Sequence, residues 1–148
     1  MKGIWMWIQV GFAAVGGFLG WFLGGFDGAL YVLIACAIAD YLSGVACAFV
    51  KKELSSEIGA RGITKKVVIF ALIGIGNLLD THLLGGGQAL RTALIFWYIG
   101  NEGISLIENA VILGVPVPDF LKNALIQVKN RPVNKSGQNN KEDDSNDA

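Results

Sequence analysis

Apolar and polar positions alternate along the chain in long blocks rather than in short periods. Four apolar runs occupy residues 4–26, 29–50, 67–84 and 92–113, and short polar or glycine-rich segments separate them. At a helical rise of about 1.5 Å per residue, each run crosses or nearly crosses a hydrocarbon layer of about 30 Å. The pattern predicts an all-α integral membrane protein with four transmembrane helices arranged as two hairpins.

The glycines of the first run indicate how helices pack. Gly16, Gly20 and Gly24 recur at every fourth position and therefore share one helical face. Small residues at this spacing let two membrane helices approach closely without a hydrophobic driving force. We expect this face, together with Gly44 in the second run, to serve in helix packing.

Polar side chains inside the apolar runs form a second candidate feature. At about 100° per residue, those of the second run share one face, and so do those of the fourth. With two more near the end of the third run, they predict a polar strip that lines a lumen or packs on protein: Asp40, Asn77, Asp80, Asn101, Glu102, Ser105, Glu108 and Asn109. We predict that the fourth run spans the membrane, because an interfacial helix would carry a cationic polar face.

Two of these acids, Asp40 and Glu102, fall near the middle of their runs and therefore at similar depth. An aspartate at mid-helix costs about 2.5–3.5 kcal/mol on insertion scales. No lysine or arginine is expected at that depth, so at least one of the two acids is predicted to be protonated in the resting state. For Arg91, pairing with Asp80 across a turn and a solvated, snorkelling side chain both fit the sequence.

A basic segment, residues 51–66, separates the two hairpins. Its cations outnumber its acids by five to two, and they are Lys51, Lys52, Arg61, Lys65 and Lys66. Because lysine and arginine accumulate in short cytoplasmic loops, this segment sets the topology and both termini are predicted to be cytoplasmic. Its serines and glycines favour turns with at most a short helix, and Thr64 is the predicted cap of the third helix.

The end of the chain changes character. Pro116 and Pro118 end the fourth run, because proline removes a backbone donor. Residues 119–129 are amphipathic and predict a short helix on the membrane surface. The polar residues 130–148 lack an apolar period and predict a disordered cytoplasmic tail, so that the membrane domain covers residues 1–129.

Composition agrees with a membrane protein and narrows its chemistry. Of the 148 residues, 53% are hydrophobic and 16% charged, and the mean hydropathy is +0.50, which fits one membrane domain. The sequence contains no recognisable nucleophile–base pair, metal-ligand cluster or phosphate-binding loop, so we predict no enzyme activity and no catalytic, metal or cofactor site. It also lacks the basic, aromatic-rich patch of a nucleic-acid-binding protein.

Several strings, in order along the chain, resemble the toxin-secretion and phage-lysis holin family. They are DYLSG at 40–44, KELSSEIGARG at 52–62, LRTA at 90–93, YIGNEGIS at 98–105, ENA at 108–110 and GVPVP at 114–118. The resemblance covers about residues 30–129 and leaves out the first helix and the tail.

The resemblance implies a multi-pass bacteriophage holin in the cytoplasmic membrane of a bacterial host. Such a protein forms homo-oligomers in the lipid bilayer and opens lesions that release a cell-wall hydrolase (endolysin) or a toxin, without stable contact with either. Two other functions fit the same helices. One is a small proton-coupled multidrug exporter, in which a membrane carboxylate alternates between proton and substrate, and the other is an antiholin that regulates a partner holin.

Overall fold

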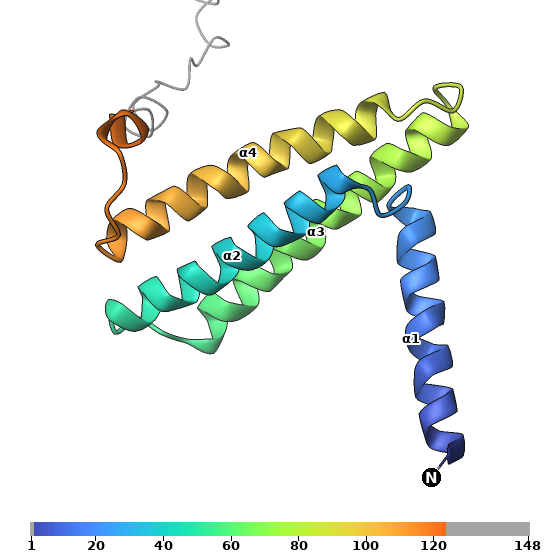
Figure 1. Cartoon of the computed structure of the whole chain (residues 1–148), viewed down its shortest axis with the longest axis horizontal. Coiled ribbons are helices and arrows are strands. Elements are labelled where there is room, and N and C mark those ends of the chain that lie inside the picture. Colours follow the sequence, from blue (N-terminus) through green and yellow to red (C-terminus); the bar gives the residue numbers. More distant parts are fainter. Residues whose placement is uncertain (1, 124–148) are drawn as a thin grey trace, which may run out of the picture. The chain divides into compact units, whose positions relative to one another are not determined.

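The computed structural model describes residues 2–123, and this part of the chain is helical without any strand. Its helices, in chain order, are α1 (Lys2–Phe22), α2 (Gly28–Val50), α3 (Ser56–His82) and α4 (Ala89–Ile112) (Figure 1). The chain divides into two compact units, Met1–Val117 and Pro118–Ala148. In the second unit residues 119–123 are helical. The rest of the predicted surface helix and the predicted tail lie outside the described residues.

Local signals set the ends of the helices. Asp27 caps α2, because its Oδ1 accepts a hydrogen bond of 2.8 Å from the backbone N–H of Leu30. Ser55 caps α3 in the same way, through a 3.2 Å bond from the N–H of Ile58. Short side-chain oxygens favour this position because they reach a free amide of the first turn. Gly24, with φ of +78°, reverses the chain after α1, in a conformation that favours glycine.

The start of α3 corrects the sequence prediction for the basic segment. The helix begins at Ser56 rather than at residue 67, so most of the predicted loop is helical. Thr64 does not cap it, since its Oγ1 donates a 2.9 Å bond to a carbonyl one turn earlier in the same helix. Gly62 lies where α3 meets α2, and a Cβ there would stand 3.0 Å from the ring of Tyr41. This glycine therefore serves close helix packing instead of a turn.

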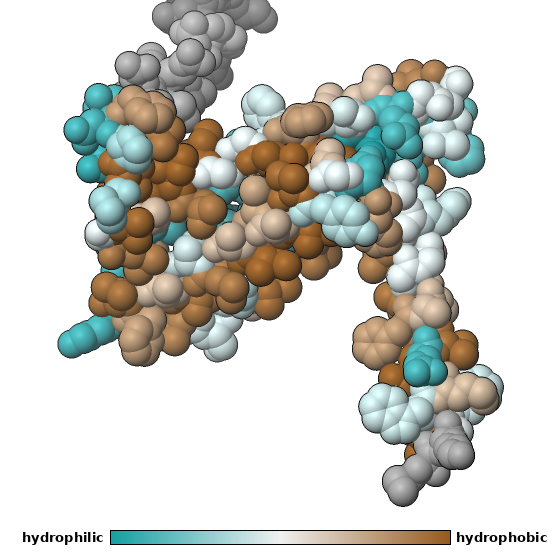
Figure 2. Space-filling model, in the orientation of Figure 1, coloured by the Kyte–Doolittle hydropathy of each residue, from teal (hydrophilic) through white to brown (hydrophobic). Residues whose placement is uncertain are grey.

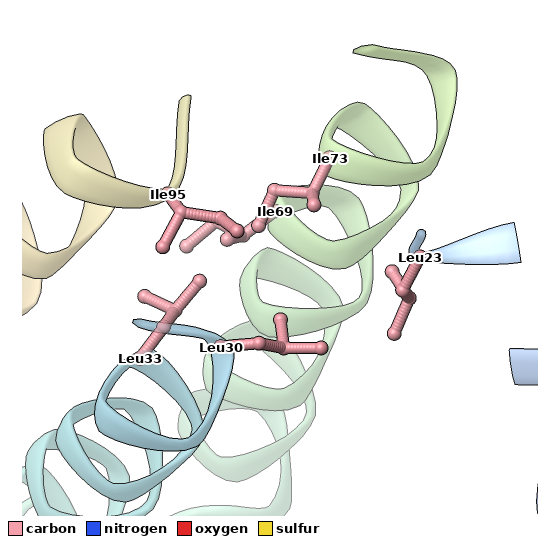
Figure 3. Close-up of a cluster of buried hydrophobic side chains, with 6 residues drawn as sticks. All are labelled: Leu23, Leu30, Leu33, Ile69, Ile73 and Ile95. Atoms are coloured by element: carbon pink, nitrogen blue, oxygen red, sulfur yellow. The ribbon is translucent and has the colours of Figure 1, made fainter. Parts of the chain in front are cut away.

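Three of the helices, α2, α3 and α4, lie side by side, with α2 and α4 running in one direction and α3 in the other (Figure 1). Apolar side chains form their common core, to which the turn after α1 adds Leu23 (Figure 3): Leu23, Leu30, Leu33, Ile69, Ile73 and Ile95. Because lipid is as apolar as these side chains, they stabilise the bundle in a membrane through close packing rather than through removal from water.

The remaining helix, α1, has few partners. It ends at Phe22 rather than at residue 26 as predicted, and among the described helices it packs closely only on α3. That contact involves its C-terminal end, where the ring of Phe22 lies against Gly74 and occupies the space of a Cβ. Asn77 Nδ2 of α3 also donates a 3.1 Å hydrogen bond to the carbonyl of Phe22. The first turns of α1 are exposed in the single chain.

The face of the molecule seen in Figure 2 is largely apolar. Three helical segments are long and apolar enough to cross a membrane, namely Gly3–Phe22, Gly28–Val50 and Ser56–His82. The predicted fourth span, α4, does not reach that standard, because its 24 residues include Arg91, Glu102 and Glu108. The structure therefore has three candidate membrane-spanning helices in its described part.

Candidate functional site

Three helices each bring one charged side chain to the same place. Asp40 comes from α2, Lys66 from α3 and Glu102 from α4, and their side chains are 17%, 17% and 7% exposed. Lys66 Nζ donates a 2.5 Å hydrogen bond to Asp40 Oδ2 and another to Glu102 Oε2. One ammonium therefore bridges two acids from different helices. We name Asp40, Lys66 and Glu102 the acid–lysine cluster.

This bridge overturns the expectation that no lysine or arginine lies at the depth of the two acids. The expectation was wrong because α3 begins at Ser56, which places Lys66 inside a helix that packs on α2. The sequence carries a usable signal. Ser55 followed by Glu57 in the first turn marks a helix start, and Lys66 then stands three and seven residues before Ile69 and Ile73 on the buried face.

Asn109 extends the cluster along α2. Its Nδ2 donates to Asp40 Oδ1 at 3.1 Å and to Ser43 Oγ at 2.9 Å. Cys47 Sγ approaches the backbone carbonyl of Asn109 at 3.4 Å. A Cβ on Gly44 would stand 3.8 Å from Asn109 Nδ2, an ordinary contact distance. The polar faces of α2 and α4 thus satisfy each other within one chain.

A second set of charged side chains lies where the helices end. Arg91 is 1% exposed, and its Nη1 donates to Asp27 Oδ2 at 2.6 Å. Its Nε and Nη2 donate to the carbonyls of Leu23 and Gly25, at 2.5 and 2.8 Å. The hydrogen bond from Arg91 holds the pKa of Asp27 below its ordinary value, because it stabilises the carboxylate. Arg91 thereby fixes the turn between α1 and α2.

Asp80 completes this second set from α3. It is 1% exposed, and its two carboxylate oxygens accept hydrogen bonds from the backbone N–H groups of Leu90 at 3.1 Å and Arg91 at 2.8 Å. A carboxylate at this place satisfies free amides in the first turn of α4, and its negative charge interacts favourably with the positive end of the helix dipole. The Arg91 guanidinium thus binds Asp27, and neither a pairing with Asp80 nor a snorkelling side chain describes it. We name Arg91, Asp27 and Asp80 the arginine cluster.

The predicted polar strip is therefore divided. Asn77 and Asp80 lie with the end of α1 and the start of α4, apart from the acid–lysine cluster. Asn101 is exposed, whereas Ser105 and Glu108 are half-buried on α4. Of the eight predicted residues, the structure brings three together: Lys66 joins Asp40 to Glu102, and Asn109 bonds to Asp40.

The predicted packing glycines have different surroundings. A Cβ on Gly16 would meet no atom within 4 Å, and one on Gly20 would stand 3.2 Å from the Phe26 ring. Gly24 is not part of the helical face, since it lies in the turn after α1 and a Cβ there would overlap Asn77 and Arg91. Within the single chain, Gly16 therefore lies on the open surface of α1, as do Gly3, Gly11 and Gly17.

The remaining predicted cations lie at the surface. The exposed ones are Lys51, Lys52, Arg61 and Lys65. Arg61 and Glu57 form an ion pair of 3.5 Å, with side chains 73% and 83% exposed, so the pair adds little stability. Lys66 is the member of the predicted basic loop that turns inward.

Comparison with known proteins identifies the family. The model of the bacteriophage holin family matches residues 17–130. The chain belongs to the bacteriophage holin family. The match begins inside α1, so it includes the contact between Phe22 and Gly74 that the sequence resemblance had left out. Both clusters lie inside the segment that is shared with other holin-family proteins.

Related proteins cover nearly the same length. The chain is similar to the uncharacterized protein CPE0383 of Clostridium perfringens strain 13, with 41% identity over 131 residues, 88% of this chain and 97% of the relative. An uncharacterized 14.9 kDa protein in the nagH 3′ region of Clostridium perfringens is also 41% identical, over 88% of this chain and 99% of its own. Protein Lin0175 of Listeria innocua is 38% identical over 80% and 84%. No solved structure gives a significant match.

Proposed function

We propose that this protein acts as a holin, which inserts into the cytoplasmic membrane of a bacterial host, forms homo-oligomers and opens lesions for an endolysin or a toxin. The placement of charge carries the proposal. Asp40, Lys66 and Glu102 turn toward one another between the helices, whereas large apolar side chains cover the outside. An apolar exterior suits lipid, and mutually paired charges suit a membrane interior.

In this proposal α4 is a fourth span despite its charges. It is bonded to the α2 region at both ends, through Arg91 and Asp27 near its start and through Asn109 and Ser43 near its end. A helix that accompanies a spanning helix along its length crosses the same layer. With four crossings and a basic segment on the cytoplasmic side, both termini are cytoplasmic.

Reporter fusions test this topology. A fusion at residue 86 should report the outer side of the membrane, and one at residue 136 the cytoplasm. An external signal at residue 136 would mean that α4 does not span, and a three-span protein would replace the four-span proposal.

The single chain represents a closed arrangement in this mechanism. Its acid–lysine cluster faces the neighbouring helices, so no water-filled path is needed to solvate the charges. In an assembly of many copies the same polar faces turn toward a shared lumen, where water replaces the Lys66 bridges. Because a lumen exists only when enough copies surround it, opening depends steeply on protein concentration. The exposed α1 surface around Gly16 is the proposed contact between copies.

Induction of the protein alone in a bacterium tests the function. Membrane potential and culture density should stay normal during a delay and then collapse abruptly. Gly16→Leu should lengthen the delay or abolish the collapse, because the larger side chain blocks close helix approach. Gly17→Leu is the matched control, since Gly17 is adjacent and also has open space around it. A leak that rises in proportion to expression from the first minutes would contradict a holin and favour an exporter.

A further inference from the structure

Asn101 of α4 is a polar side chain that the bundle leaves without a partner. It is exposed in the single chain. Among the residues that the structure describes, its amide makes no hydrogen bond. The other asparagines of α3 and α4 behave differently, because Asn77 donates to the carbonyl of Phe22 and Asn109 to Asp40. Asn101 is therefore turned away from the contacts that hold its own chain together.

The depth of Asn101 makes this exposure costly in a membrane. Counted from Ala89, it is the thirteenth of the 24 residues of α4. When α4 crosses the bilayer, the amide lies about 15 Å from either edge of a hydrocarbon layer of about 30 Å. A side chain this short does not reach the lipid headgroups, and acyl chains neither donate nor accept hydrogen bonds. Lipid therefore covers the apolar side chains of this surface but does not satisfy Asn101.

The surface around Asn101 has room for another helix. Gly100, the residue before it, is exposed, and a Cβ there would meet no atom within 4 Å. Trp97 lies one turn before Asn101 on the same face and is 68% exposed. Small residues let membrane helices approach closely, and asparagine side chains then form hydrogen bonds between them. We name Trp97, Gly100 and Asn101 the α4 outer surface.

We propose that the α4 outer surface binds the same surface of a second copy, with the two Asn101 amides hydrogen-bonded to each other. An amide carries both donors and an acceptor, so two asparagines complement each other across a two-fold axis. Copies inserted in the same direction hold Asn101 at the same depth, which lets the two amides meet. Glu108, which has an interaction of its own, lies about 10 Å further along each helix, where crossing helices have diverged.

The contact extends the proposed function, and it rests on that function for the crossing of α4. A contact between identical surfaces closes at two copies. The exposed α1 surface around Gly16 is a separate contact on another helix. Two different contacts in each copy let pairs join into larger assemblies, while the Asn101 pair stays inside each pair. The pair formed through α4 is therefore the unit from which the proposed assembly grows.

Disulfide formation between copies tests the contact. The full-length protein, with Cys36→Ala and Cys47→Ala, is placed in phosphatidylcholine vesicles at a low protein-to-lipid ratio and treated with an oxidant. Trp97→Cys places a thiol one turn from Asn101 and should link two copies. Phe96→Cys is the matched control, because Phe96 is an adjacent aromatic residue, 62% exposed, that is turned about 100° around the helix axis. Adding Asn101→Leu to Trp97→Cys should lower the initial rate of linking about 3- to 30-fold.

Asn101→Gln keeps an amide and should retain most of the linking. Circular dichroism checks that the variants fold, which is expected because Asn101 has no hydrogen bond to the described part of its own chain. The proposal is overturned if Phe96→Cys links as fast as Trp97→Cys, or if Asn101→Leu leaves the rate unchanged. Linking does not depend on lysis. A protein that shows the Asn101-dependent link but opens no lesions would contradict the holin function and leave the contact standing, whereas lesions without this link would overturn the contact alone.

Discussion

The two polar clusters have the same ingredients, one cation and two acids, but they are attached to the chain in different ways. In the arginine cluster, Arg91 binds backbone carbonyls as well as Asp27, and backbone amides bind Asp80. In the acid–lysine cluster, side chains in the middle of helices bind one another. A charge held by backbone groups at helix ends fixes the fold, whereas charges held by other side chains can exchange partners while the helices stay intact. Arginine with its rigid fork suits the first task, and flexible lysine the second.

The strongest test of this contrast is the removal of Arg91. Arg91→Ala leaves Asp27 and two carbonyls of the α1–α2 turn without their donor, and we expect a loss of about 3–5 kcal/mol in the free energy of unfolding. Denaturation in detergent micelles measures it. Arg61→Ala is the control, because its exposed ion pair contributes little. Equal stability of the two variants would contradict the structural role of the arginine cluster.

A smaller effect is expected from Asp80→Asn in the same cluster. The amide keeps one acceptor oxygen but presents an NH₂ group to the backbone amides of α4, so the cap is weakened by about 1–2 kcal/mol. Asp119→Asn, at a side chain 92% exposed, is the control. If the Asp80 variant unfolds at the same denaturant concentration as the control, Asp80 does not hold the start of α4.

In the acid–lysine cluster, Asp40→Asn and Glu102→Gln should affect function more than stability. Because Lys66 keeps one acid partner in each variant, we expect a change below about 1 kcal/mol in the free energy of unfolding. Insertion should remain intact, while the time at which lesions open should change. Membrane-fraction blots and lysis curves measure the two properties. Unchanged lysis timing in both variants would remove these acids from the mechanism.

The smallest expected effect is a pH dependence at the arginine cluster. The pKa of Asp27 is lowered in the folded protein, so its contribution to stability is fully present above the ordinary pKa of aspartate. It is lost as the pH falls through the lowered value, below about pH 4. The side chain is 44% exposed, so solvent screening keeps the effect small. Between about pH 6 and pH 2, the free energy of unfolding should therefore decrease less for Asp27→Asn than for the wild type, as measured from unfolding curves at each pH.

The sequence predicted helix positions where apolar length alone decides them. The predicted run 29–50 corresponds to α2, Gly28–Val50, and the predicted run 92–113 to α4, Ala89–Ile112. The start of α3 was missed because the prediction took helix bounds from apolar runs, and residues 56–66 form a helix although many of them are polar. Arg61 and Lys65 stay on its exposed side while Lys66 turns inward. Hydropathy does not distinguish an exposed cation from one that turns inward. Its position around the helix axis, relative to the buried apolar side chains, does.

For the candidate site, the sequence predicted the polar faces of single helices but not the charged partners that other helices supply. The polar face that Asp40 shares with Ser43 and Cys47 follows from helical spacing, and the structure brings Asn109 of α4 to it. The partner of the acids, Lys66, depended on the helix start and was missed. The partner of Arg91 was missed too, because Asp27 lies 64 residues away in the chain and no local pattern connects them.

The native thiol of Cys47 offers the most direct test of the central claim, that lesions open when the polar faces of α2 and α4 turn from each other to water. Cys47 is 6% exposed and lies beside Asn109. In a Cys36→Ala background, broken membranes collected before and after the onset of lysis are treated with a small, charged thiol reagent. Ser56→Cys, combined with Cys36→Ala and Cys47→Ala, provides an exposed control. We predict that Cys47 is protected before onset and labelled afterwards, whereas continued protection in membranes from fully lysed cells would contradict the claim.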